Sequence, residues 1–235
     1  MQQNEFIFKK FAVSHSRSSM KVGVDAVLLG CWVTTEKKKI LEIGCGCGVI
    51  SLILAQRIPK AKILAIDIDE DSVKESEENF MKSPWKERLK VLKMEFPEEI
   101  IERKEKFDLI ICNPPYFCSG ISNPKTSREK ARHQASLSAF TLIQNAHLLL
   151  REDGILAMIF PTEFLSDVKE KIRENRLHIR KLCFIKNKPE SKEKRVMIEI
   201  SMEESLCEEE KLVLFVEGNP TDSYQRLCKD FYLKF

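Results

Sequence analysis

Short apolar runs alternate with amphipathic segments through the first half of the chain. The apolar runs predict buried strands at 40–43, 61–66, 89–94 and 107–112. Segments in which apolar residues have helical spacing, at 49–57 and 71–81, separate the first three of these strands. Strands that alternate with helices are typical of a parallel sheet with helices on its faces. The pattern therefore predicts an α/β fold.

The second half of the chain continues this pattern and then becomes richer in strands. Helices are predicted at 137–150, 163–175 and 223–229, and strands at 155–160, 178–185, 195–201 and 211–216. A short strand at 6–13, a polar loop and a helix at 22–30 precede the first buried strand. No internal repeat and no long linker divides the sequence. We therefore expect a single domain that spans residues 1–235.

Composition limits the class of protein. The chain has 235 residues, of which 43% are hydrophobic and 32% are charged, as expected for a soluble domain with a sizeable core. No apolar run is long enough to cross a membrane, and the first five residues lack the layout of a signal peptide. The eight cysteines include no Cys-x-x-Cys pair and no zinc-finger spacing. We expect free thiols in a reducing cytoplasm and no metal site.

The net charge of +3 conceals segments of strong and opposite charge. Residues 169–195 carry eleven Lys and Arg against four Glu, and residues 125–133 carry four against one. Residues 67–78 carry seven acids against one Lys, and residues 199–210 carry six acids and no base. Basic patches of this kind are able to meet phosphate groups. The alternative is that each charged run is a solvated face.

The tetrapeptide Asn113-Pro114-Pro115-Tyr116 directly follows the predicted strand at 107–112. Proline cannot continue a sheet ladder, so Asn113 is expected at the carboxyl end of a strand, where α/β sheets bind ligands. The Asn113 amide oxygen and the Pro114 carbonyl are both able to accept hydrogen bonds from one planar NH2 group. Such a pair would orient the nitrogen for attack on a methyl group, and Tyr116 offers an aromatic face for stacking. The alternative is an ordinary proline-rich turn.

Glycines occupy alternate positions between the predicted strand at 40–43 and the helix at 49–57. Gly44, Gly46 and Gly48 allow a tight turn and a close approach of a ligand to the backbone. Their spacing differs from the Gly-x-Gly-x-x-Gly of dinucleotide folds. Glu42 lies in the strand before them, where a carboxylate either accepts hydrogen bonds from a cationic amino group or orients the loop through water. An ordinary strand-to-helix turn is the alternative.

Two further acids follow the next two predicted strands. Asp67 ends the strand at 61–66, where a carboxylate is able to accept both hydroxyls of a ribose. A helix cap is the alternative, although Asp69 suits that role better. Glu95 follows the third strand, where it either meets an adenine edge or is a surface acid. Sites for an amino group, a ribose and an adenine on successive strand ends fit S-adenosylmethionine as cofactor.

Nearly the whole chain resembles the bacterial tRNA1(Val) adenine N6-methyltransferase family, which belongs to the Rossmann-type S-adenosylmethionine-dependent enzymes. The resemblance lies in Phe6-x-Phe8-Lys9-x-Phe11, residues 20–30, the 44–48 loop, residues 79–85, the Asn113 motif, and residues 131–133 and 230–233. It implies a class I methyltransferase: a Rossmann-like, seven-stranded, mostly parallel sheet with helices on both faces. It also implies that the extension formed by residues 1–39 packs on the cofactor and substrate site.

The resemblance adds Lys21 and Asp25 to the expected cofactor-binding residues, which are otherwise Glu42, Gly44, Gly46, Gly48, Asp67, Glu95 and Asn113. The chain departs from the family pattern at Val24, where Thr is expected, so a contact to the cofactor is expected to be absent there. Cys45 and Cys47 replace the threonines of the family's glycine loop, a change that we expect to be harmless.

The activity implied by the resemblance is methylation of the exocyclic N6 of an adenine in tRNA, 3′ of the anticodon. Asn113, Pro114 and Tyr116 are the expected catalytic residues, acting on a base flipped out of the RNA. The phosphate contacts are expected from Arg128, Lys130, Arg132 and His133. Three alternatives stay open: methylation of a protein glutamine N5, methylation of another RNA or DNA adenine, and a non-catalytic RNA-binding module.

Overall fold

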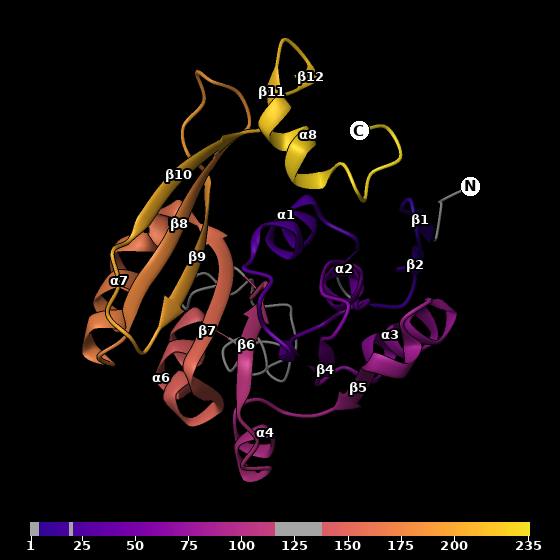
Figure 1. Ribbon diagram of the computed structural model, residues 1–235, viewed down its shortest axis with the longest axis vertical. Coiled ribbons are helices and arrows are strands. Elements are labelled where there is room, and N and C mark those ends of the chain that lie inside the picture. Colours follow the sequence, from indigo (N-terminus) through magenta and orange to yellow (C-terminus); the bar gives the residue numbers. More distant parts are fainter. Residues whose placement is uncertain (1–4, 19–20, 116–137) are drawn as a thin grey trace, which may run out of the picture.

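A computed structural model describes residues 5–18, 21–115 and 138–235 of the chain (Figure 1). Most of the residues predicted to form the site lie within these ranges. Five of them lie outside the described residues: Tyr116, Arg128, Lys130, Arg132 and His133.

Eight strands form the central sheet, in the order β10-β8-β9-β7-β6-β3-β4-β5. Their bounds are β3 Lys39–Ile43, β4 Lys62–Asp67, β5 Leu89–Lys93, β6 Phe107–Cys112, β7 Leu150–Pro161, β8 His178–Lys186, β9 Arg195–Ser201 and β10 Glu208–Val213. β9 runs antiparallel to both of its neighbours, and the other strand pairs of this sheet are parallel. The α/β fold with a mostly parallel sheet is therefore confirmed.

The expected number of seven strands is one too low. The strand at the far edge, β10, begins with three glutamates and contains one buried residue, Leu212. It pairs in parallel with β8, and it begins three residues earlier than the strand predicted at 211–216. Its first half is acidic and exposed, so no continuous apolar run marks it as a strand of the main sheet.

Helices cover both faces of this sheet (Figure 1). On one face lie α1 Val24–Trp32, α2 Val49–Arg57 and α3 Glu70–Lys82, and on the other α4 Glu98–Glu102, α6 Ala139–Leu149 and α7 Leu165–Glu174. β6 shows how the two cores share one strand. Leu109 and Ile111 belong to the first core, and Ile110 and Cys112 to the second. A strand that is buried on both faces has this continuous apolar pattern.

The ends of the chain pack beside each other on the first core. The predicted strand at 6–13 is a hairpin of two strands, β1 Glu5–Ile7 and β2 Ala12–Ser14. Near the other end, β11 Phe215–Val216 and β12 Asn219–Pro220 form a small ribbon before α8 Asp222–Cys228. Aromatic rings from the two segments are in contact, because Phe8 stacks on Tyr232. Short 3-10 helices lie at Lys86–Arg88 (η1) and Thr162–Phe164 (η2).

Helix length also bears on the membrane question. In the described ranges, every helix is too short or too polar to cross a bilayer.

Candidate active site

Asn113 lies at the point where the strand order of the sheet reverses. From β3 the chain adds β4 and β5 on one side, and then returns to place β6 on the other side of β3. All six residues of β6 are buried, and Pro114 and Pro115 follow the strand where its ladder ends. Ligands of open α/β sheets bind outside the carboxyl ends of the strands at such a reversal. The expected position of Asn113 is confirmed, and its role stays a prediction.

An apolar hollow adjoins the two prolines of this motif. Its other walls come from the start of α6, the end of β7, and the η2–α7 segment, including Phe140, Phe160, Pro161, Phe164 and Val168. Rings and methyl groups form most of these walls. Because both prolines belong to the lining, an apolar group that enters the hollow would contact the motif itself.

The glycine loop turns sharply between β3 and α2. Gly44, Gly46 and Gly48 have φ angles of +69°, +55° and +76°, which residues with side chains rarely adopt. A Cβ on Gly48 would lie 2.5 Å from Cε1 of Phe80 in α3. The backbone N–H of Gly44 also donates to the carbonyl of Ile66 at 2.9 Å. The predicted loop is therefore a fixed turn that α3 packs against.

Glu42 lies beneath this loop and is only 1% exposed. Its Oε2 accepts hydrogen bonds from the backbone N–H of Ser51, at 2.9 Å, and from the Ser51 hydroxyl. Burial raises the pKa of Glu42 to about 8, although both bonds from Ser51 act in the opposite direction. The carboxyl group holds the first turn of α2, which agrees with the loop-orienting alternative. Its contact with a cofactor amino group stays a prediction.

Asp67 ends β4 and contacts the glycine loop directly. Its Oδ2 accepts a hydrogen bond from the backbone N–H of Gly46 at 2.8 Å, and its Oδ1 accepts one from Asp69 at 3.0 Å. Burial raises the pKa of Asp67 above its ordinary value, and these backbone donors oppose the increase. The cap of α3 is Asp69, whose Oδ2 accepts from the backbone N–H of Ser72 at 2.9 Å. Asp67 is therefore not the helix cap.

The other three residues expected to bind the cofactor lie in three different parts of the structure. Glu95 is exposed beyond the edge strand β5, and its backbone N–H donates to Glu99 at 2.6 Å. Lys21 is exposed just before α1. Asp25, in the first turn of α1, forms an ion pair with Arg195 at the start of β9. This partner of Asp25 is 170 positions away, and no sequence pattern indicates it. A cofactor role for the three residues stays a prediction.

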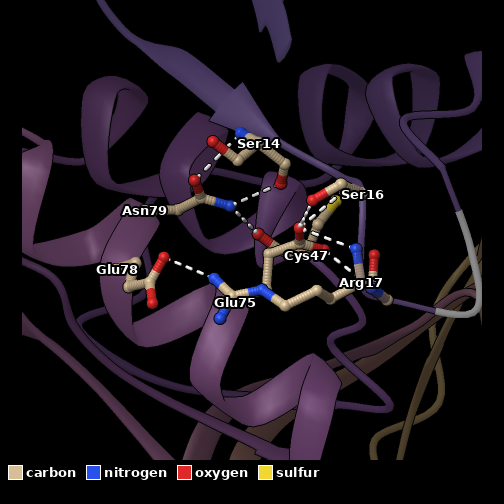
Figure 2. A network of polar contacts seen from close by, with 8 residues as sticks. Ser14, Ser16, Arg17, Cys47, Glu75, Glu78 and Asn79 are labelled. Atoms are coloured by element: carbon tan, nitrogen blue, oxygen red, sulfur yellow. Dashed lines mark hydrogen bonds and ion pairs between the residues drawn. The ribbon is translucent and has the colours of Figure 1, made fainter. Parts of the chain in front are cut away.

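A polar network binds the segment after β2 to α3 and to the glycine loop (Figure 2). We name residues 14–18 the N-terminal strap. Oδ1 of Asn79 accepts from the backbone N–H of Ser14 at 2.9 Å. Nδ2 of Asn79 donates to the carbonyl of Ser14 and to that of Cys47, both at 2.9 Å. One amide side chain therefore joins the strap to the glycine loop.

The carboxylate of Glu75 accepts hydrogen bonds from the rest of the strap. Its Oε1 accepts from the backbone N–H groups of Ser16 and Arg17 at 2.7 and 3.0 Å (Figure 2). Its Oε2 accepts from the backbone N–H of Ser18 at 2.8 Å. Glu75 has no exposed surface. Burial disfavours its charge, but the amide donors outweigh that cost and lower the pKa of Glu75. The buried charge is therefore compensated by hydrogen bonds.

The roles of Glu75 and Asn79 were not predicted from the sequence. A signal for them exists in α3, where the buried residues are Ser72, Glu75, Ser76, Asn79 and Phe80. These positions form a stripe at helical spacing, and four of its five members are polar. A polar stripe on the inner face of a helix indicates hydrogen bonds to another segment, although it does not identify that segment.

The two cysteines of the glycine loop are buried thiols. Burial raises the pKa of Cys45 well above its ordinary value and that of Cys47 to about 12, so both stay protonated near neutral pH. Within the described residues, no group of three or more His, Cys, Asp or Glu could hold a metal ion.

Comparison with known proteins extends these observations to a family. Residues 7–175 match the methyltransferase small domain family. A tRNA1(Val) (adenine(37)-N6)-methyltransferase of Parabacteroides distasonis is 38% identical over 97% of this chain and 98% of its own length. The protein of that name from Bacteroides thetaiotaomicron is 36% identical over 97% of both chains. A predicted O-methyltransferase from Agrobacterium tumefaciens shares the fold, with a TM-score of 0.67 and 16% identity over 88% of this chain and 96% of that chain.

These similarities extend over the glycine loop, the Asn113 motif and the strands that carry them. The resemblance seen in the sequence motifs is therefore confirmed. The chain belongs to the methyltransferase small domain family and, within it, to the tRNA1(Val) (adenine(37)-N6)-methyltransferases.

Proposed function

We propose that this protein transfers a methyl group from S-adenosylmethionine to the exocyclic N6 of adenine 37 in tRNA1(Val). The observation that carries the proposal is the position of Asn113, Pro114 and Pro115 at the carboxyl end of β6, where the strand order reverses beside the glycine loop. Relatives that share more than a third of this sequence over nearly their whole length are named for that activity.

The glycine loop and Asp67 suit S-adenosylmethionine. Three glycines with positive φ present backbone without side chains, and Asp67 at the next strand end offers carboxylate acceptors for a ribose. In this proposal Gly44, Gly46 and Gly48 line the cofactor site, and Glu42 and Asp67 hold the loop and the ribose. The remaining proposed cofactor-binding residues are Lys21, Asp25, Glu95 and Asn113. When bound, S-adenosylmethionine supplies an electrophilic methyl group.

The protein's part in the chemistry is to orient the amine. The Asn113 amide oxygen and the Pro114 carbonyl accept the two N–H bonds of the adenine amino group, which directs the nitrogen lone pair toward the methyl group. The ring of Pro114 fixes its φ angle and so limits the freedom of this acceptor. The nitrogen that receives the methyl group becomes cationic and acidic, so its proton leaves to water or to these acceptors. Positioning of this kind lowers the barrier without a strong base.

We propose tRNA as the partner, with Tyr116 stacking on the base and Arg128, Lys130, Arg132 and His133 contacting phosphates. These five residues lie outside the described part of the chain and enter as sequence predictions. We also propose one domain over residues 1–235 whose extension, residues 1–39, covers the cofactor and substrate site. The contacts of the strap with α3 and the glycine loop support this arrangement. A cytoplasmic location suits the substrate and the free thiols among the described cysteines.

A methyl-transfer assay with labelled S-adenosylmethionine tests the proposal. Total tRNA is the first substrate, followed by a tRNA1(Val) transcript and a matched transcript in which adenine 37 is replaced by guanine. We expect label in N6-methyladenosine of the first transcript and none in the second. Label on a protein glutamine would replace the proposal with the amide-methylating alternative, and label only in other RNA or DNA would change the substrate.

A further inference from the structure

The connection between β8 and β9 carries an unusual concentration of positive charge. Lys186, Lys188, Lys192, Lys194 and Arg195 lie within ten residues that also contain two glutamates. We name residues 186–195 the basic hairpin, because β8 and β9 pair in antiparallel fashion and Ile185 lies opposite Arg195. The segment has a net charge of +3, which equals the net charge of the whole chain.

Three of these lysines have no counter-charge within the described ranges. Lys188, Lys192 and Lys194 are exposed, and no ion pair or side-chain hydrogen bond involves their amino groups. Other charged groups of the hairpin do have partners: Glu193 pairs with Lys211 at 3.2 Å, and Arg195 pairs with Asp25. The hairpin therefore presents three uncompensated ammonium groups to solvent.

The backbone of the basic hairpin is held on both sides of its base. The carbonyl of Lys194 accepts from the backbone N–H of Thr162 at 3.1 Å, where β7 ends. On the other side, the carbonyls of Lys186 and Asn187 accept from Leu214 and Phe215 at 2.9 and 3.0 Å. These bonds fix the backbone that carries the lysines before any partner arrives, which reduces the ordering cost of binding.

The tip of the hairpin is closed by Ser191. Its backbone N–H donates to the carbonyl of Lys188 at 3.0 Å, and its Oγ accepts from the backbone N–H of Lys188 at the same distance. Among the hydrogen bonds described for the hairpin, one uses a lysine amino group, that of Lys186, which donates to the Pro189 carbonyl at 2.9 Å, and none uses the amino group of Lys188, Lys192 or Lys194. The charges are therefore separable from the fold of the hairpin.

The basic hairpin lies at the same edge of the sheet as Asn113. Arg195 is opposite Pro161, the last residue of β7, and β7 is the neighbour of β6. Two strand spacings, about 10 Å, therefore separate the start of β9 from the strand that ends at Asn113. Figure 1 shows the connection between β8 and β9 extending past the end of β7. A polymer whose target group reaches Asn113 from the β7 and β9 side of the sheet would pass close to these lysines.

We propose that the basic hairpin binds the phosphate backbone of the RNA strand that flanks the target adenine. The inference rests on the proposed function, because it assumes that the substrate is a polyanion. Ammonium groups that are carried on a held backbone, have no counter-charge among the described residues and lie beside the proposed reactive strand end match a chain of phosphates, and they contact it without reading its sequence. The hairpin supplies affinity and orientation, whereas selection of the base occurs at the Asn113 motif.

The test compares two triple variants with the same change of charge. The first is Lys188→Gln with Lys192→Gln and Lys194→Gln. The matched control is Lys60→Gln with Lys62→Gln and Lys104→Gln, three exposed lysines at the opposite, amino edge of the sheet. Because no described contact of the fold uses the amino groups of Lys188, Lys192 and Lys194, we expect both variants to melt at the wild-type temperature.

The measurement is tRNA binding at salt concentrations from about 50 to 200 mM. Each lost phosphate contact reduces the slope of log K against log salt by about 0.7–0.9, so the hairpin variant is expected to lose roughly 2 from the slope. The control is expected to keep the wild-type slope. Equal slopes for the hairpin variant and the wild type would overturn the inference, and so would an equal loss in the control, which would indicate a general effect of net charge.

A comparison of RNA substrates of different lengths separates this inference from the proposed function. With tRNA, the hairpin variant is expected to have a raised KM at nearly unchanged kcat, and with a trinucleotide it is expected to match the wild type. An equal loss on both substrates would place the hairpin in the reaction itself and overturn a backbone role. If wild-type protein fails to methylate tRNA, the proposed function fails, while the salt titration still decides whether the hairpin binds RNA.

Discussion

The N-terminal strap and the basic hairpin lie beside the same edge of the sheet and use charge in opposite ways. At the strap, Glu75 is completely buried and three backbone N–H groups compensate its charge. At the hairpin, Lys188, Lys192 and Lys194 are exposed and have no such partners in the described structure. The charge beside the strap therefore holds the backbone in place, whereas the charge of the basic hairpin stays available to a ligand.

The largest expected effect belongs to the residue between these two regions. Asn113→Ala removes an acceptor of the amino group, so we expect kcat to fall about 100–1,000-fold while S-adenosylmethionine binding changes little. Single-turnover kinetics and calorimetry measure the two quantities. The control is Asn145→Ala, which removes a bond to the Thr141 carbonyl within α6. Activity of the Asn113 variant within tenfold of wild type would refute the amine-orienting role.

A second variant tests how tightly the strap side is packed. Gly48→Ala forces a residue with φ +76° to carry a Cβ that lies 2.5 Å from Phe80. We expect a loss of about 2–4 kcal/mol in the free energy of unfolding, from the left-handed backbone and from overpacking. Gly218→Ala is the control, because its φ of +83° carries the same strain and its Cβ meets nothing within 4 Å. Equal losses in urea denaturation would show that packing on α3 is unimportant.

The charge of the strap is tested by Glu75→Gln. The variant replaces a carboxylate oxygen by an NH2 group that faces backbone donors, so we expect a loss of about 1.5–3 kcal/mol in stability. Trypsin is also expected to cut after Arg17 sooner than in the wild type, because the strap opens more often. Glu78→Gln is the control: Glu78 directly precedes Asn79 in α3, is exposed and forms an exposed ion pair with Arg17, so little change is expected. Identical behaviour of the two variants would contradict the holding role of Glu75.

Over any single pH unit, the smallest expected effect is a pH dependence from Glu42. Its pKa is raised from 4.5 to about 8, so the folded protein keeps a proton that the unfolded chain releases near pH 4.5. Between these values the native state binds more protons, and stability therefore falls as pH rises, by at most about 1.4 kcal/mol per unit. Glu42→Gln should flatten this part of the profile in urea titrations at several pH values. An unchanged slope in the variant would show that Glu42 is ionised when folded.

The parts of the site that sequence reasoning located are those set by local patterns. Apolar runs placed the strand ends, and prolines and glycines placed the Asn113 motif and the 44–48 loop at them. The contacts of Asp25 with Arg195 and of Glu75 with the strap join segments 170 and 57–59 positions apart, so no local pattern encodes them. The start of β10 was predicted too far along the chain, because an acidic, exposed edge strand lacks the apolar run of a buried strand.

In the basic hairpin, the groups that determine the shape differ from the three exposed amino groups that carry free charge. This separation affects how such an enzyme is able to change during evolution. Backbone groups, the Ser191 hydroxyl and the Lys186 amino group give the hairpin its shape, and the amino groups of the three exposed lysines take no part in its described hydrogen bonds. Substitutions at Lys188, Lys192 and Lys194 therefore escape the stability threshold that restricts most mutations. Affinity for substrate is free to drift, or to be engineered, one lysine at a time, while the fold and the reacting group stay the same.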